Sequence, residues 1–151
     1  MTMNRKLTRA TDVNRVSELL GLPEEINDTE GLIAQVSVGL PTGSVEKILE
    51  VLNSPPELNL ISERAFRRAK SEKLPLSPVK SQILYDFARA YVVADRVYHG
   101  NGALVMRFLE KPNPDLGGAV PMAIAISSPA GADAVIEILN KQTNLNVFEE
   151  T

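Results

Sequence analysis

Residues 62–73 read SERAFRRAKSEK, and the rest of the chain is organised around this stretch. Its five basic and two acidic residues give it a charge of +3, whereas the whole chain carries −3, so the remainder carries −6. Such a concentration of charge is a local pattern rather than a drift in composition. With Ser62 as N-cap, the spacing predicts a helix that turns Ile61, Ala65 and Phe66 inward and its arginines outward.

This basic helix has two interpretations, and its twelve residues alone do not decide between them. A solvated helix face is the simpler one. The other is a helix that contacts nucleic-acid phosphates, because clustered Lys and Arg supply the electrostatic part of such binding. The candidate DNA-binding residues are then Arg64, Arg67, Arg68, Lys70 and Lys73.

The composition favours an all-α fold. Hydrophobic residues make up 44% of the 151 residues, but aromatic residues only 5%, so aliphatic side chains and alanine fill the core. Few segments alternate in the way half-buried strands do. There is no Cys, no apolar run close to the roughly 18 residues of a membrane span, and no apolar segment after the basic N-terminus. We therefore expect a cytoplasmic protein that does not enter membranes.

The first half of the chain predicts short helices separated by Gly and Pro. A first helix starts at Thr11 or Asp12, and a second, opened by Asp28 or Thr29, buries Leu32, Ile33 and Val36. Ser44 caps a third helix over residues 45–52, and Pro56 opens a very short helix over residues 57–60. The basic helix follows.

The second half predicts longer helices. Ser77-Pro78 starts the longest helix, which runs to about residue 98 with Ile83, Leu84, Phe87, Tyr91, Ala94 and Tyr98 on its inner side. Further helices are expected over residues 103–110 and 122–126, and from Pro129 to about residue 141. The two prolines of the Lys111–Pro114 segment predict a turn between them.

No constellation of residues supports catalysis. His99 is the single histidine and lies at a helix end, where a cation is favourable. Without Cys, a single His cannot build a tetrahedral zinc site. Neither Gly100 with Gly102 nor Gly117 with Gly118 has the spacing of a phosphate-binding loop. We expect no enzyme, no metal and no cofactor.

The C-terminal end is the second candidate site. Leu145, Val147 and Phe148 lie in an otherwise polar and acidic segment, together with Asn146, Glu149 and Glu150. One interpretation is a frayed end or a strand folded back on its own domain. The other is a peptide-like segment that inserts into a partner's groove with Phe148 as its anchor.

Taken together, the chain resembles the Xre/MbcA/ParS antitoxin family over roughly residues 30–141. Residues 39–45 resemble the GLP…SV start of the family's helix-turn-helix region, and residues 61–68 resemble its IS-x-R-[TA]-[LF]-x-RR signature. Residues 76–78 and 87–90 are similar to the LS…LAR start of its toxin-binding domain. Residues 109–121 resemble the L-x-x-PN-x-x-LGG-x-x-P hallmark, and residues 131–135 the terminal GA-x-x-V helix.

The resemblance implies a type II antitoxin in four parts: an N-terminal arm and short helix (1–25), an Xre-like helix-turn-helix domain (26–74), a small helical toxin-binding domain (75–141) and a tail (142–151). It implies a homodimer that represses its own promoter. It also implies a RES-domain toxin as partner, one that degrades NAD or transfers its ADP-ribose, with the tail covering the toxin's active site. The structural turn of the toxin-binding domain is then formed by Pro112, Asn113, Gly117, Gly118 and Pro121.

A second hypothesis is a stand-alone helix-turn-helix regulator with no toxin partner. A RES-like reading frame immediately beside this one would favour the antitoxin, and its absence would favour the regulator. A steep loss of DNA affinity with rising salt would mark phosphate-dominated binding under either hypothesis.

Overall fold

The computed structural model describes residues 10–23, 25–52 and 63–150, and within these ranges the chain is helical without any strand. The elements are α1 (Ala10–Leu19), α2 (Thr29–Val38), α3 (Gly43–Leu52), α4 (Glu63–Glu72), α5 (Pro78–Val97), α6 (Gly102–Glu110), the 3₁₀ turn η1 (Pro114–Leu116), α7 (Pro121–Ser127) and α8 (Pro129–Glu150). The predicted all-α class is confirmed. The expected short helix over residues 57–60, Ile61 and the Ser62 cap lie outside the described residues.

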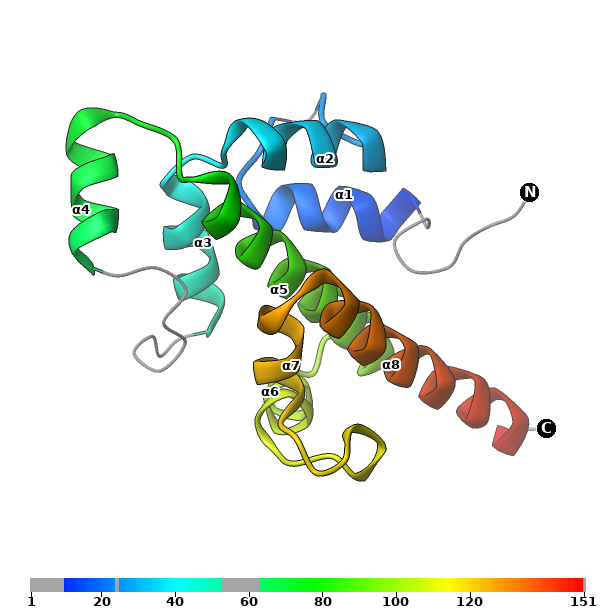
Figure 1. Cartoon of the computed structure of the whole chain (residues 1–151). Coiled ribbons are helices and arrows are strands. Elements are labelled where there is room, and N and C mark those ends of the chain that lie inside the picture. Colours follow the sequence, from blue (N-terminus) through cyan, green and yellow to red (C-terminus); the bar gives the residue numbers. More distant parts are fainter. Residues whose placement is uncertain (1–9, 24, 53–62, 151) are drawn as a thin grey trace.

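Helix α5 is the element against which most of the others pack (Figure 1). Ser77 accepts a hydrogen bond from the Lys80 amide at its start, and Pro78 occupies the first turn, as the sequence predicted. Twelve of its 20 residues are buried. Of the predicted inner stripe, Leu84, Phe87 and Ala94 are fully buried, and the other three members are partly buried.

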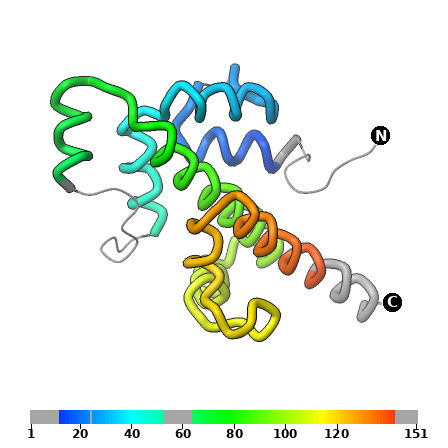
Figure 2. Tube along the Cα trace, viewed as in Figure 1, coloured from blue at the N-terminus to red at the C-terminus, as the bar shows by residue number. Residues whose placement is uncertain are grey.

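The two halves of the chain share one hydrophobic core through α5. Helices α1, α2 and α3 pack on it from the N-terminal half, and α6, α7 and α8 pack on it from the C-terminal half (Figure 2). Buried residues of both halves belong to the same cluster, from Val16 and Leu32 to Val105 and Leu139. The predicted boundary between residues 74 and 75 stays a prediction, since the core itself runs across it.

The turn after α2 joins the segment before α5 through backbone contacts. The Leu40 carbonyl accepts from the Leu76 amide at 2.8 Å, and the Leu40 amide donates to the Ser81 hydroxyl at 2.8 Å. Gly39 has φ of 120°, and a Cβ there would lie 2.4 Å from the Leu76 carbonyl oxygen. This close approach is the physical reason for glycine in the Gly39-Leu40-Pro41 turn.

Three local predictions in the first half were wrong or incomplete. Asp28 caps α2 as predicted, but Ile33 is 51% exposed rather than buried beside Leu32 and Val36. Helix α1 begins at Ala10, so Asp12 lies within the helix, where it is buried and ion-paired. Ser44 lies inside α3 instead of capping it, because its hydroxyl donates to the Leu20 carbonyl at 2.5 Å.

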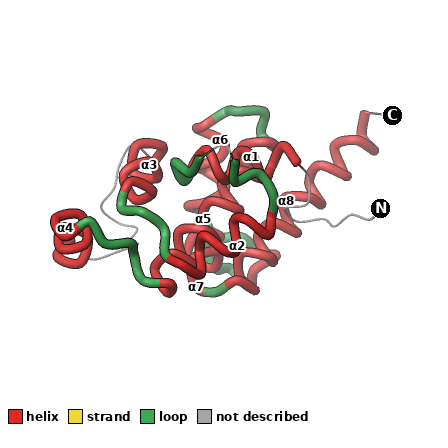
Figure 3. The backbone as a smooth tube through the Cα atoms, turned by 90° about the horizontal axis from the view of Figure 1, so that it is seen from above, coloured by secondary structure: helices red, strands yellow, loops and turns green. Residues whose placement is uncertain are grey.

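Helices α4 and α8 mark opposite ends of the molecule. In two perpendicular views α4 lies beside α3 at one end, while the last turns of α8 extend away at the other (Figures 1 and 3). The sequence pattern predicted a helix end near Gln142, but α8 continues to Glu150. The segment predicted as a separate tail is therefore continuous with the last helix.

Candidate functional site

Helix α4 carries four of the predicted basic residues on its surface, and the fifth, Lys73, follows directly after the helix. Arg64, Arg67, Arg68, Lys70 and Lys73 are all exposed, and so is Ala65, which was expected to face inward. Phe66 and Ala69 are the half-buried residues that pack against the core. The helix thus has a narrow apolar contact and a broad basic surface, which is the arrangement that contact with phosphates requires.

Lys70 and Arg68 each form an ion pair. Lys70 Nζ lies 2.6 Å from Glu46 Oε2 on α3 and 5.7 Å from the centre of the Phe66 ring. Arg68 Nε lies 3.5 Å from Glu72 Oε2 one turn further along the same helix. The two pairs differ in what they join: the Lys70 pair connects α4 to α3, whereas the Arg68 pair lies within α4.

The predicted structural turn is a closed loop between α6 and α7. The Asn113 side chain accepts from the Asp115 amide at 2.8 Å, and its backbone carbonyl accepts from the Leu116 and Gly118 amides, both at 2.9 Å. Its own amide donates to the Ala119 carbonyl at 3.0 Å. One asparagine thus organises both sides of the loop, which explains its place between two prolines.

The remaining residues of this turn fix how it ends. Gly117 and Gly118 have φ of 65° and 87°, a region that favours glycine. Pro112 is exposed, whereas Pro121 is buried in the first turn of α7. The structure therefore brings together all five predicted turn residues between two packed helices. It supports a structural role for them.

Helices α7 and α8 are in close contact. Ser128 accepts from the Gly131 amide at 2.9 Å, as expected for the cap of α8. A Cβ on Gly131 would lie 2.1 Å from the Ile124 carbonyl oxygen on α7, far inside any real contact. Glycine at this position therefore sets the spacing of the two helices.

A buried charged cluster joins α5 to the start of α8. The Arg89 guanidinium donates to Asp86 Oδ1 at 2.8 Å, to Asp133 Oδ1 at 2.7 Å and to the Pro129 carbonyl at 3.3 Å. Gln82 adds a second donor to Asp86 at 2.9 Å. This cluster was not predicted from the sequence. Its signal in the sequence was Asp86 and Arg89, three residues apart in a mainly apolar helix. Charged side chains in such a helix indicate a buried ion pair, because charges are rarely buried unless they are paired.

The electrostatics of this cluster follow from its burial. Loss of solvent raises the pKa of the Asp86 carboxyl, although the hydrogen bond from Arg89 opposes that change. Burial lowers the pKa of Arg89, but hydrogen bonds to Asp133 and Asp86 outweigh it and the net pKa is raised. Arg89 therefore stays charged, and it also lies 5.3 Å from the Tyr85 ring centre.

A second ion pair ties the N-terminal helix to the C-terminal half. Arg96 at the end of α5 holds both carboxylate oxygens of the buried Asp12 at 3.1 Å. The same guanidinium donates to the Asn140 side chain on α8 at 3.3 Å. Such two-point contacts fix orientation as well as distance, so α1, α5 and α8 are held in one arrangement.

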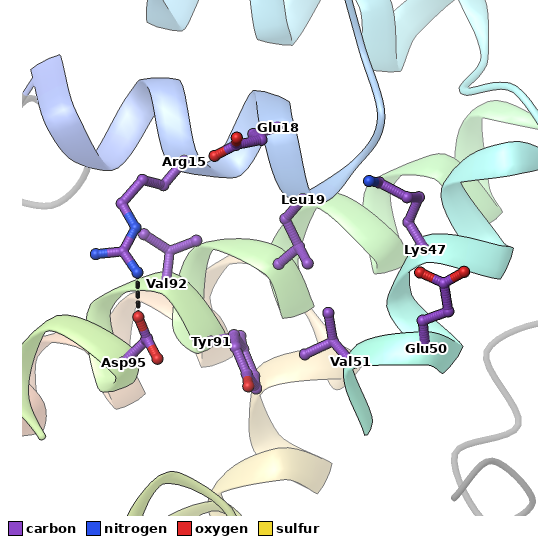
Figure 4. Close-up of a pocket in the computed structure, with 9 residues that line it drawn as sticks. All are labelled: Arg15, Glu18, Leu19, Lys47, Glu50, Val51, Tyr91, Val92 and Asp95. Carbon is purple, nitrogen blue, oxygen red and sulfur yellow. Dashed lines mark hydrogen bonds and ion pairs between the residues drawn. The ribbon is translucent and has the colours of Figure 1, made fainter. Parts of the chain in front are cut away.

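A cavity of about 290 Å³ lies between α1, α3 and α5 (Figure 4). Arg15 reaches across it to Asp95, Lys47 and Glu50 come from α3, and Tyr91 forms part of its floor. Burial, and then the nearby Asp95 carboxylate, raise the pKa of the Tyr91 hydroxyl. Both cations and carboxylates thus line the cavity. Their arrangement does not indicate a catalytic nucleophile or general base among the residues drawn in Figure 4. In the described ranges no three His, Asp or Glu side chains gather as metal ligands.

The predicted toxin-binding residues belong to the last turns of α8. Leu145, Asn146, Val147, Phe148, Glu149 and Glu150 follow Gln142, which accepts from the Tyr98 hydroxyl at 2.7 Å. Beyond this contact with the end of α5, the side chains of α8 lie outside what the structure describes. The proposed role of the six residues stays a prediction.

These features define an all-helical binding protein with an outward basic helix at one end and a packed C-terminal helical domain. Residues 93–142 match the family model of the antitoxin Xre/MbcA/ParS C-terminal toxin-binding domain. This match confirms the resemblance to the antitoxin family and supports an antitoxin role in a toxin–antitoxin system. The match points to a non-enzymatic regulatory protein. No curated protein matches the sequence. None of the described helices is both long and apolar enough to cross a membrane.

Proposed function

We propose that this chain neutralises a RES-domain toxin and represses the promoter of its own operon. The observation that carries the proposal is the match of residues 93–142 to a toxin-binding domain. In this proposal the protein acts in the cytoplasm as a homodimer, and its partners are the toxin and promoter DNA. The toxin degrades NAD or transfers its ADP-ribose.

The C-terminal end of α8 is the segment we assign to the toxin's active site. Helix α8 extends past the packed helices (Figure 1), so this end is accessible to a partner. Positions 145 and 148 lie three residues apart in a continuous helix and so share a face. Two apolar residues at these positions, followed by the acidic Glu149 and Glu150, suit a cleft that binds an anionic cofactor through basic groups.

Growth rescue tests the toxin half of the proposal. The adjacent toxin gene is expressed with the full-length chain or with a chain that lacks residues 143–151, and growth and cellular NAD are measured. We expect full rescue by the intact chain and a strong loss of rescue by the truncated one. Leu145→Ala with Phe148→Ala should weaken rescue, while Asn144→Ala serves as the matched control. Full rescue by the truncated chain would remove the tail from the mechanism.

Helix α4 is the element we assign to the promoter. Its outward basic face supports this role, because exposed Arg and Lys contact phosphates without large rearrangement. Replacing Arg67 and Arg68 together with Ala should lower affinity for the DNA upstream of the gene by about tenfold or more, and reduce the salt dependence. A gel-shift titration at several salt concentrations measures both. Unchanged retention of the promoter fragment would exclude α4 as the contacting helix.

A further inference from the structure

Glu46 of α3 is an acidic residue that contacts the basic helix α4. It lies in the first turn of α3 and its Oε2 is 2.6 Å from Lys70 Nζ in the last turn of α4. An exposed carboxylate at the edge of a phosphate-binding surface repels DNA unless it is neutralised. Lys70 supplies that neutralisation.

The contacts of α4 explain why such a pair matters. Phe66 and Ala69 pack against the core only partly. After the helix, the Leu76 amide donates a hydrogen bond to the Leu40 carbonyl at 2.8 Å. The linker residues Lys73, Leu74 and Pro75 join the end of α4 to this hydrogen-bonded residue. Lys73 has φ of 56°, so the chain turns sharply directly after α4. This anchor fixes where α4 ends but not how the helix is rotated about its own axis.

The Lys70–Glu46 pair restrains this rotation. Lys70 lies in the last turn of α4, and its ion pair with Glu46 joins this helix to α3. The ammonium also lies 5.7 Å from the centre of the Phe66 ring, so the ring and the carboxylate attract it at the same time. The rotation of α4 thereby becomes tied to α3, whose Val45 and Ile48 are buried in the core.

We propose that Glu46 and Lys70 form a positioning pair that orients α4 for DNA, so that Lys70 is not itself a phosphate contact. The inference rests on the proposed DNA-binding function. It changes the role of one of the five predicted DNA-binding residues and adds a residue from another helix. Arg64, exposed in the first turn of α4, is the matched residue for comparison.

A charge swap tests the pair. Exposed ion pairs are worth little, so Lys70→Ala and Glu46→Ala should each weaken binding to the upstream DNA about two- to fivefold. The double variant Glu46→Lys with Lys70→Glu should regain affinity to within about twofold of the parent, because it rebuilds the pair with the same net charge. If Lys70 contacts a phosphate, the swapped protein would instead bind as weakly as Lys70→Glu alone, and the proposal fails.

The salt dependence provides a second readout. Each phosphate contact contributes about −0.9 to the slope of log affinity against log salt. Lys70→Ala should leave that slope unchanged, whereas Arg64→Ala should reduce it by about one contact. A loss of slope in Lys70→Ala equal to that in Arg64→Ala overturns the assignment.

Amide hydrogen exchange separates this inference from the proposed function. In the full chain without DNA, α4 amides should exchange faster in Lys70→Ala than in the parent and recover in the swapped variant. If these exchange differences appear but the protein binds no DNA, the positioning pair is supported and the proposed DNA-binding function is contradicted. Identical exchange in the parent and Lys70→Ala would overturn the pair whatever the DNA result.

Discussion

Helix α4 and the contact between α7 and α8 show two ways in which one chain holds a helix. Helix α4 is attached by two half-buried side chains, a surface ion pair and a tight linker. Helices α7 and α8 approach so closely that a single Cβ on Gly131 would meet backbone. Tolerance to substitution should therefore differ sharply between the two regions, because strain in a packed interior cannot be relieved by movement.

The difference has a functional meaning. A packed C-terminal region presents a partner with a preformed surface, so little ordering entropy is lost on binding. The basic helix has small contacts with the rest of the fold, so its orientation depends strongly on each of them, the Lys70–Glu46 pair included. The predictions below measure how far the two regions really differ in stability.

The largest effect is expected for Gly131→Ala. The new methyl would lie 2.1 Å from the Ile124 carbonyl oxygen, so α7 and α8 must separate, at a cost of about 3 kcal/mol. Chemical denaturation measures the loss. Gly102→Ala is the matched control, since a Cβ there has nothing within 4 Å and should change stability by less than about 1 kcal/mol. Equal midpoints for the two variants would show that the contact between α7 and α8 can relax.

Asp86→Ala should have the next largest effect. It removes the oxygen that accepts from Arg89 and Gln82 and leaves the buried guanidinium with one carboxylate, the partly exposed Asp133, so we expect a loss of about 2–3 kcal/mol. Asp133→Ala removes the more exposed partner and should cost less than about 1 kcal/mol. Thermal unfolding compares them. A larger loss in Asp133→Ala would reverse the assigned importance of the two partners.

The same carboxyl predicts a pH dependence. Since burial raises the pKa of Asp86 in the folded state, the folded protein binds this proton more tightly than the unfolded chain. Its contribution to stability is therefore greatest below the ordinary value of 3.8 and is lost as pH rises through the raised pKa. The stability gap between the parent and Asp86→Ala should change across that acidic interval and stay constant above it. A gap independent of pH would contradict the raised pKa.

Phe66→Ala should act locally. It removes the aromatic contact of α4 with the core, so amide exchange within α4 should increase markedly. The global free energy of unfolding should fall by no more than about 1 kcal/mol, because the Phe66 side chain is only half-buried. A global loss as large as that of Gly131→Ala would show that α4 belongs to the cooperative core after all.

The smallest effect is expected for Glu72→Gln. Its pair with Arg68 is long, at 3.5 Å, and both side chains are at least half exposed. Pairs one turn apart on an exposed helix contribute about 0.5 kcal/mol or less, and salt screens them. Denaturation at low and high salt should give nearly the same midpoint as the parent. A clear loss at low salt would assign this pair a role in holding α4.

Sequence reasoning succeeded where local chemistry decides the structure. Asp28 and Ser77 cap their helices as predicted, and the Pro–Asn–Pro segment forms its turn, because each needs only a few neighbouring residues. The prediction failed where a distant partner decides. Ser44 bonds to the Leu20 carbonyl, Asp12 finds Arg96 across the fold, and α8 continues beyond Gln142.

The candidate sites divide in the same way. The five basic residues and the turn residues followed from charge and turn chemistry. The basic residues are exposed, with Lys73 just after α4 and Lys70 paired with Glu46, while their role stays a prediction. The Asp86–Arg89–Asp133 cluster did not follow, because no spacing along the chain reveals that Asp133 approaches from another helix. The side chains of the C-terminal residues are outside the described structure, so that candidate stays a prediction.

The shared helix α5 has a consequence for how this protein can be divided. The matched domain begins at residue 93, inside α5, so a fragment cut there would lose Leu84, Phe87 and Arg89. The C-terminal helices would then expose apolar surface and an unpaired Asp133 where α5 had covered them. A fragment that keeps the contacts of the C-terminal helices with α5 must therefore begin no later than Ser77, well before the residue at which the family match starts.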